Sequence, residues 1–297
     1  MSSEPADPAA RSRAIVSVAC GAALIAFAPI GMRLSEVGPQ ATAFWRFMFA
    51  LPILAVAAFL LPRAKGPLAL TGRQFGVLAL AGLMFGLELG LWHIALGKTS
   101  VLNATLASNM TPLLVAAAGF FLFKEPITRA FLIGVAVAVS GAVMLSTARA
   151  QAGIGTVSLV GDLFGLASAC GYAVYLILVG RARKTLDVRT VMLVTTAAAA
   201  VYALVAATAL GESLWPQSWK GWAIVVALGV VTQAGGQGLI AAGLGRLPLA
   251  LSAVLLWVQP VTAAGLSWVL FGEALGPLAL LGAALVLGGV WVVQRGR

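Results

Sequence analysis

Two charged side chains lie inside long apolar segments of this sequence, Arg46 near the start of one segment and Glu88 late in the next. If both segments are helices that cross a hydrocarbon core of about 30 Å, a rise of about 1.5 Å per residue puts the two side chains at a similar depth. An ionised side chain at that depth costs about 3 kcal/mol or more unless it is paired or hydrated. We therefore expect Arg46 and Glu88 to form a pair or to share an aqueous cavity. Contact of Glu88 with a substrate ammonium or a proton is the functional alternative.

Aromatic and amide residues fall near the middle of other apolar segments, namely Asn109, Tyr172, Tyr175 and Trp257. Ring faces and hydrogen-bonding groups at one depth suit an amphipathic aromatic ligand. Gln233 belongs either to the same polar site or to the amide contacts that hold membrane helices together. Ordinary interhelical packing remains the alternative for each single residue, while the set as a whole predicts a substrate-binding site.

Two prolines, Pro112 and Pro260, stand in the middle of apolar segments. Proline lacks an N–H, so the carbonyls of Ser108 and Leu256 lose their helical donors and each helix can bend. Gln259 immediately precedes Pro260, where its amide could cap a freed backbone group or face a ligand. The two prolines predict hinges, and static kinks are the alternative because membrane helices tolerate proline.

The sequence offers few residues for catalysis. His93 is the only histidine, and Glu88 is the only acid deep in an apolar segment. An intramembrane enzyme would need a Ser/His dyad or two acids, and a histidine-rich metal site would need more than one histidine. No nucleotide-binding P-loop motif is present. We therefore expect neither an enzyme nor a cofactor.

The composition and the apolar runs predict the elements that position these residues. Of the 297 residues, 61% are hydrophobic and only 9% are charged, which leaves too little polar surface to cover a soluble globule. The apolar runs are continuous, so they predict an all-α membrane protein and not a barrel. Ten transmembrane helices are expected, at residues 14–32, 41–61, 75–96, 101–123, 127–147, 160–180, 190–210, 221–243, 249–271 and 276–293.

The chain repeats itself at an offset of about 148 residues. Asn109 to Pro112 matches Trp257 to Pro260, and the exit Lys124-Glu125 matches Gly272-Glu273. We expect a cytoplasmic tail at 1–13, a five-helix repeat at 14–147, an external linker at 148–159 and a second repeat at 160–297. Because five is odd, the second repeat must be inverted in the membrane, and such proteins place their site near the midplane between the repeats.

Orientation follows from the cations. With both termini in the cytoplasm, fourteen of the 19 Lys and Arg residues fall on the inner side and four on the outer side. This bias is a strong positive-inside signal. The net charge of +10 therefore indicates topology and contact with the lipid bilayer, and nucleic acid is not expected as a partner.

The five-plus-five arrangement, the proline-centred fourth helix of each half and the short exits at Lys124-Glu125-Pro126 and Gly272-Glu273 resemble the EamA domain family of the drug/metabolite transporter superfamily. Overall, the chain is similar to YddG-type exporters of aromatic amino acids. The resemblance implies a multi-pass protein of the bacterial inner membrane. It also implies alternating access, a cavity between helices one to four and six to nine, and helices five and ten at the periphery.

A secondary transporter that exports aromatic and other apolar amino acids explains these features best. An exporter of cationic drugs or other small metabolites is the alternative, and a lipid scramblase is a more distant one. A channel would be expected to show charge rings or a carbonyl filter, and neither is visible. The spacing of Gly134 with Ala138, and of Gly282 with Val286, favours helix packing or a homodimer contact.

Overall fold

The computed structural model describes residues 8–60, 70–99, 107–124, 128–150, 158–272 and 275–295, and these residues form helices and loops without a strand. The first part of the chain holds α1 (Pro8–Ile25), α2 (Ala28–Leu34), α3 (Pro39–Leu60), α4 (Gly72–Lys98), α6 (Thr111–Phe123) and α7 (Arg129–Ala150). The second part holds α8 (Leu159–Ala182), α9 (Val188–Ala209), α10 (Trp219–Ala227), η1 (Leu228–Gln237), α11 (Gly238–Leu244), α12 (Leu249–Leu255), α13 (Val258–Phe271) and α14 (Pro277–Arg295).

Eight helical segments are long and apolar enough to cross a membrane, judged by length and composition. Two further apolar helices, Thr111–Leu122 and Arg129–Leu145, are shorter. They fall in the fourth and fifth of the ten predicted spans, and residues 100–106, where the fourth begins, lie outside the described part of the chain. The structure thus bears out an all-helical membrane protein, while the number ten remains a prediction.

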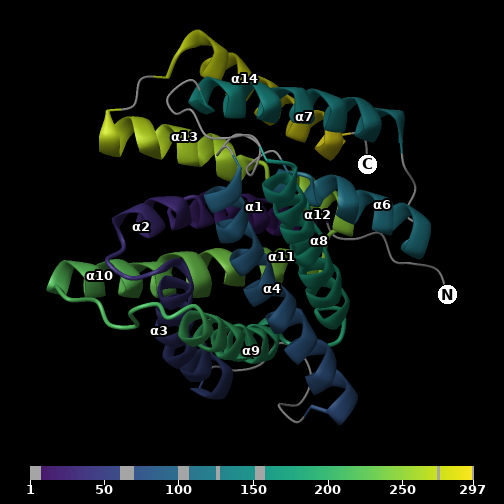
Figure 1. Ribbon diagram of the computed structural model, residues 1–297. Coiled ribbons are helices and arrows are strands. Elements are labelled where there is room, and N and C mark those ends of the chain that lie inside the picture. Colours follow the sequence, from purple (N-terminus) through teal and green to yellow (C-terminus); the bar gives the residue numbers. More distant parts are fainter. Residues whose placement is uncertain are drawn as a thin grey trace.

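Helices from the two parts of the chain pack against one another instead of forming two separate bundles. α4 contacts α8 and α9, α3 contacts α9 and η1, and α1 contacts η1 and α11. α7 and α14 lie side by side along one edge of the molecule (Figure 1). This edge position is the one that the resemblance implies for the fifth and tenth helices.

Glycines allow α7 and α14 to approach closely. A methyl group at Gly141 would lie 2.6 Å from the carbonyl oxygen of Gly282, and one at Gly134 would lie 2.7 Å from that of Gly289. The two helices therefore run in opposite directions. The small-residue surface proposed above for helix packing or a homodimer is thus occupied within the chain.

Three predicted spans are interrupted, and a proline follows each interruption closely. The first span breaks between α1 and α2 before Pro29, the fourth breaks before Pro112 and the ninth breaks before Pro260. A proline in the first turn of a helix leaves no unsatisfied N–H, so each can begin a new helical segment. Pro52, by contrast, lies inside α3 without a break. The sequence predicted bends at Pro112 and Pro260, and the structure has helix breaks there.

The eighth span contains a π-helical stretch, η1, between α10 and α11. Long π-helices are rare, and short ones often mark functional sites. Gln233 and Gln237 lie on η1, and both are 1% exposed. The wider turn therefore places two amides inside the bundle.

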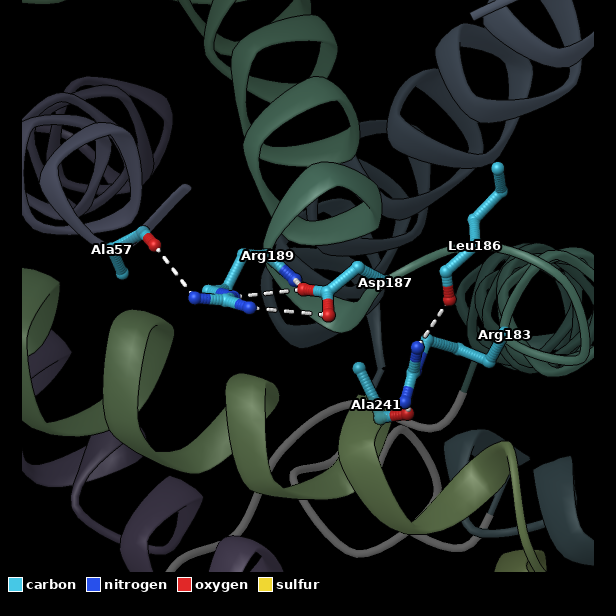
Figure 2. Close-up of polar contacts among 6 residues, drawn as sticks. All are labelled: Ala57, Arg183, Leu186, Asp187, Arg189 and Ala241. Carbon is cyan, nitrogen blue, oxygen red and sulfur yellow. Dashed lines mark hydrogen bonds and ion pairs between the residues drawn. The ribbon is translucent and has the colours of Figure 1, made fainter. Parts of the chain in front are cut away.

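The loop between α8 and α9 ties neighbouring helices together at one end of the molecule (Figure 2). Arg189 forms an ion pair with Asp187 at 2.8 Å and donates from Nη1 to the Ala57 carbonyl of α3 at 3.1 Å. Arg183 donates from Nε to the Ala241 carbonyl of α11 at 2.9 Å. Burial lowers the pKa of the Arg183 guanidinium, and the charge of Asp187 opposes that shift.

Two acids perform a similar role at the opposite ends of these helices. Glu36, in the loop after α2, accepts hydrogen bonds from the backbone N–H groups of Gln217 and Ser218, each at 2.9 Å, at the start of α10. Glu212, in the loop after α9, accepts from the backbone N–H of Ala41 at 2.9 Å at the start of α3. Carboxylates at helix N-termini satisfy unpaired N–H groups and match the helix dipole.

Candidate functional site

A stack of aromatic rings fills the space between α3, α4 and α8. The rings of Phe85 and Tyr175 stack with centroids 4.7 Å apart, and those of Tyr172 and Tyr175 stack at 5.8 Å. Phe47 packs against Phe85 at 5.7 Å. Tyr172 and Tyr175 are one turn apart on α8, so both rings project towards the same neighbours. These four rings, called the aromatic stack below, join the first part of the chain to the second.

Arg46 lies against this stack. Its side chain is buried, and its guanidinium carbon lies 6.0 Å from the centre of the Phe47 ring and 5.9 Å from that of Phe85. These distances are at the outer limit of a cation–π contact. Nε of Arg46 is buried and has no hydrogen-bond partner among the described residues. The structure thus places a buried cation beside aromatic ring faces.

Glu88 faces α8 from α4. Ser168 donates its hydroxyl hydrogen to Oε1 of Glu88 at 3.4 Å, and Gly171 passes close to the Cβ of Glu88. The charges of Glu88 and Arg46 interact. No nitrogen of Arg46 lies within 4.0 Å of a Glu88 oxygen, within the described part of the chain. The two residues are therefore electrostatic neighbours without the direct ion pair that the sequence suggested as one outcome.

Amides from η1 border the same region. Gln233 donates from Nε2 to the Thr196 hydroxyl of α9 at 3.0 Å, and Gln237 interacts with the hydroxyl of Tyr172. The Oε1 atoms of Gln233 and Gln237 are buried without a partner among the described residues. Buried polar atoms are normally paired, so unpaired acceptors inside a bundle indicate a place where a polar ligand or water binds.

Asn109 and Trp257 meet at the breaks of the fourth and ninth spans. The indole Nε1 of Trp257 donates to the backbone carbonyl of Asn109 at 3.3 Å, and the amide Nδ2 of Asn109 is buried without a partner among the described residues. Thr111 donates its hydroxyl hydrogen to the Ser108 carbonyl at 2.9 Å, which supplies the donor that Pro112 cannot. The two residues that match at an offset of 148 are thus in direct contact.

The structure does not bring every predicted residue into one cluster. Tyr172 and Tyr175 belong to the aromatic stack, and Arg46 and Glu88 lie beside it. Gln233 bonds Thr196 of α9 instead. Asn109 and Trp257 form a second contact, and α8 connects the two groups, because Ser168 bonds Glu88 and the next residue, Ala169, accepts from Thr111 at 3.3 Å. Gln259 is half-buried, and its side chain makes no hydrogen bond within the described residues.

Sequence reasoning did not select Phe47, Phe85, Ser168 and Thr196. Phe47 and Phe85 are apolar residues in apolar helices and differ in no visible way from core residues. A weak signal existed for Phe85, because it lies three residues before Glu88 and therefore on the same helical face. Ser168 and Thr196 carried no comparable signal.

A metal centre has no support in the described residues, which contain no group of three or more His, Cys, Asp and Glu side chains placed to hold an ion. His93 lies on α4 beside Trp92, with ring centroids 5.3 Å apart, and neither of its ring nitrogens has a hydrogen-bond partner among the described residues. The side chains near the aromatic stack can therefore recognise a ligand by charge, by hydrogen bonding and by contact with ring faces.

Comparison with known proteins identifies the family. The pattern of the EamA-like transporter family matches residues 12–147 and again residues 159–295. The chain belongs to this family. It is therefore a membrane transporter and a multi-pass integral membrane protein, and its family fits the bacterial inner membrane.

Two relatives extend this finding. Over 78 residues the chain is 36% identical to the uncharacterized transporter sll0355 of Synechocystis sp., a match that covers 26% of this chain and 24% of the relative. A crystal structure of a protein 24% identical in sequence superimposes with a TM-score of 0.81, covering 96% of this chain and 97% of the other. At that identity, the second likeness shows the fold alone.

Proposed function

We propose that this transporter exports aromatic and other apolar amino acids from the bacterial cytoplasm by alternating access, in the manner of YddG-type exporters. The observation that carries the proposal is the aromatic stack with Arg46 and Glu88 beside it, lined by helices from both matched parts of the chain. An apolar or aromatic side chain matches the rings, and a zwitterion needs polar partners nearby. The direction of transport rests on the resemblance alone.

Many transporters that work by alternating access are built from two related halves. Three observations support an inverted repeat of five and five helices. The family pattern matches the chain twice. α7 and α14 cross in opposite directions, with Gly141 of one near Gly282 of the other. Asn109 and Trp257, which match in the repeat, touch each other. A residue and its repeat counterpart can be in contact only near an axis that relates the halves.

The site residues then take proposed roles. Tyr175 and Trp257 contact the substrate side chain, while Asn109, Tyr172, Gln233 and Gln259 offer hydrogen bonds. Trp257 is 2% exposed, so its ring becomes available to substrate only in another conformation. Arg46 and Glu88 couple electrostatically, and Pro112 and Pro260 act as hinges.

The buried cation bears on the drug-export alternative. A cationic drug would bring a positive charge towards Arg46, whose guanidinium has no direct ion-pair partner within 4.0 Å among the described residues. Like charges in a medium of low dielectric constant repel strongly. This arrangement favours a substrate that also carries a negative group.

Counterflow in liposomes tests the proposal. Purified transporter is reconstituted with unlabelled phenylalanine inside, and the uptake of labelled Phe, Trp, Thr, Leu, Lys and Glu and of a dicationic dye is measured. We expect uptake of the apolar and aromatic amino acids to exceed that of Lys, Glu and the dye. Preference for Lys, Glu or the dye over every apolar amino acid would refute the proposed substrate class.

A further inference from the structure

We propose that Arg46 and Glu88 form a divided site for the two charges of a zwitterion, in which Arg46 binds the substrate carboxylate and Glu88 binds its ammonium group. This inference rests on the proposed function and assigns the recognition of the head group to two charged residues instead of to the amides. The ligand class is an α-amino acid with an apolar or aromatic side chain.

The donor side of the site is Arg46. Its guanidinium carries five N–H donors and makes no hydrogen bond within the described residues, although its side chain is only 5% exposed. Contacts with the Phe47 and Phe85 rings offset only part of the cost of burying the charge. Planar guanidinium matches carboxylate geometry in a bidentate manner, which makes a carboxylate the ligand that Arg46 fits best.

The acceptor side is Glu88. The Ser168 hydroxyl, at 3.4 Å from Oε1, is the one side-chain donor to this carboxylate in the described residues. A carboxylate has about four acceptor positions, so Glu88 has capacity for an ammonium group, which brings three donors. Gly171 leaves the backbone of α8 close to Glu88 without a side chain between them.

The spacing of the two charges supports a divided site over a structural ion pair. Arg46 and Glu88 lie close enough for their charges to interact but do not come within 4.0 Å of each other. In a medium of low dielectric constant, a direct pair would satisfy both groups better than this separation does. A zwitterion placed between them would pair each charge and leave the site and its ligand without net charge.

The repeat argues that Glu88 is not required by the fold. At the offset of 148, the counterpart of Glu88 in the sequence is Gly236. Gly21 matches Gly171 at an offset of 150 near the start of the chain. A methyl group at Gly171 would lie 3.3 Å from the Cβ of Glu88, and one at Gly21 would lie 2.6 Å from the Gly236 carbonyl oxygen and 2.9 Å from the Ile240 side chain. The same helix contact is therefore made without an acid in the other half. Helix packing therefore does not need Glu88, whose acidic side chain is available for substrate binding in one half of the chain.

The aromatic stack completes the site. The centre of the Phe85 ring lies 5.9 Å from the Arg46 guanidinium carbon, and the same ring stacks on Tyr175, so the aromatic rings lie next to the charged groups. An amino acid whose head group lies between Arg46 and Glu88 would place its side chain against these rings. Ring-to-ring contacts add attraction beyond burial, which favours aromatic side chains over aliphatic ones of similar size.

The test uses substrates that lack one charge. Counterflow is measured for phenylalanine, for phenylethylamine, which lacks the carboxylate, and for 3-phenylpropionate, which lacks the ammonium. We expect the wild-type transporter to prefer phenylalanine over both analogues by about tenfold or more, since each analogue leaves one buried charge unpaired. Thermal stabilisation of the unmodified transporter by the same three compounds should give the same order, and this measurement needs no variant.

Two variants then assign each charge to its residue. Arg46→Gln should abolish the preference for phenylalanine over phenylethylamine, and Glu88→Gln should abolish the preference over 3-phenylpropionate. Glu36→Gln removes an acid in the loop after α2 that bonds the start of α10 and not the stack, and it should leave the order of substrates unchanged. If a variant fails to fold, the order in which the wild-type transporter prefers the three compounds still decides whether it recognises both charges of the substrate.

The outcomes separate the inference from the function on which it rests. Equal transport of phenylalanine and its two analogues, or variants that retain the wild-type order, would overturn the divided site and leave amino acid export standing. Failure of the wild-type transporter to move any apolar amino acid would remove the proposed function itself.

Discussion

Trp257 joins the two matched parts of the chain at the level of one side chain. Its ring is 2% exposed and its Nε1 donates to the Asn109 carbonyl at 3.3 Å. A tryptophan is the largest side chain that the interior can lose, and its removal leaves a cavity as well as an unpaired carbonyl. The contact between these repeat counterparts is therefore expected to contribute strongly to stability.

Replacement of Trp257 by Ala should lower the free energy of unfolding by about 3–5 kcal/mol. Replacement by Phe keeps most of the ring but loses the donor, and should cost less, about 1–3 kcal/mol. Trp268 lies on α13, the helix that begins directly after Trp257, and is 55% exposed, so Trp268→Ala provides the matched control with a change within about 0.5 kcal/mol. Thermal unfolding in detergent measures all three, and equal losses for Trp257→Ala and Trp268→Ala would refute the structural role.

Glu36 links the stability of the molecule to pH. Hydrogen bonds from the Ser218 hydroxyl and backbone, and from the Gln217 backbone, hold the pKa of Glu36 below its ordinary value of 4.5. A carboxyl group with a lowered folded-state pKa stabilises the fold above its unfolded pKa, and this contribution disappears as pH falls through the folded value.

The stability difference between wild type and Glu36→Gln should therefore be constant well above pH 4.5 and should shrink towards zero as pH falls below that value. The measurement is a series of thermal unfolding midpoints between about pH 3 and pH 7. A difference that stays the same down to the lowest pH would show that the hydrogen bonds to Glu36 do not depend on its ionisation.

Among the helices, the prolines separate into two kinds. Pro112 and Pro260 closely follow breaks, and Thr111 supplies a donor to the carbonyl that Pro112 leaves unpaired. Pro52 lies within α3, which continues past it. A break gives two short helices that can reorient about their junction, whereas a continuous helix moves as one body.

We expect Pro112→Ala and Pro260→Ala to slow counterflow by about three- to tenfold, equivalent to about 0.7–1.4 kcal/mol, while substrate affinity changes less. Alanine restores the N–H and favours a continuous helix, which stiffens the junction. Pro52→Ala should leave the transport rate near that of wild type. Wild-type rates for both Pro112→Ala and Pro260→Ala would remove the hinge role.

Neighbouring glycines on α14 test the packing of α7 on α14. A methyl group at Gly289 would lie 2.5 Å from the Gly134 carbonyl oxygen, while one at Gly288 would meet nothing within 4 Å. Overpacking of a close helix contact costs about 1–3 kcal/mol, so Gly289→Ala should destabilise the transporter by about that amount. Gly288→Ala should be neutral or slightly stabilising. Equal melting temperatures for the two variants would contradict the close approach.

The helices show how much of the fold could be predicted from the sequence. Continuous apolar runs locate a membrane helix well, and α4, predicted at 75–96, is observed at Gly72–Lys98. The extension at its start comes from a capping box between Thr71 and Gln74, which hydrophobicity does not report. The prolines predicted bends at Pro112 and Pro260, where the structure has helix breaks. The break before Pro29 and the π-helical stretch η1 were not predicted by any local pattern.

The site was predictable to a lesser extent. Charged, amide and aromatic residues inside apolar runs are easy to recognise, and four of the predicted residues, Arg46, Glu88, Tyr172 and Tyr175, lie in or beside the aromatic stack. The separation of Arg46 from Glu88 could not be predicted, since depth along two helices does not fix how those helices rotate towards each other. Phe47 and Phe85 were missed because their type is common everywhere in a membrane protein.

At the scale of the whole molecule, residues of opposite charge stabilise the two ends of the helix bundle, with arginines at one end and glutamates at the other. Arg183 and Arg189 bind helix carbonyls at one end, and Glu36 and Glu212 bind helix N–H groups at the other. Cations near helix C-termini and anions near N-termini both match the helix dipole. The arginines at one end also follow the cation bias that predicts this end to be cytoplasmic.

Orientation can be tested on the two sides of a single helix. α9 runs from Val188 to Ala209, and its 22 residues span about 33 Å, enough to cross a membrane. Thr185 precedes α9, Ser213 follows it, and both are exposed. If α9 crosses the membrane, cysteines at these two positions must face opposite sides, whatever the total number of spans.

The positive-inside rule assigns the side of each position, and Thr185 lies beside the arginine-rich end. In a background with Cys20→Ala and Cys170→Ala, which removes the two free and exposed thiols, a membrane-impermeant maleimide should label Ser213→Cys in right-side-out vesicles. Thr185→Cys should react only after the vesicles are permeabilised. Labelling in the reverse pattern would invert the predicted orientation, and with it the assignment of the Glu36 and Glu212 contacts to the outer side, while the packing of the helices would be unaffected. Labelling of both positions in intact vesicles would show that α9 does not cross the membrane as a single helix.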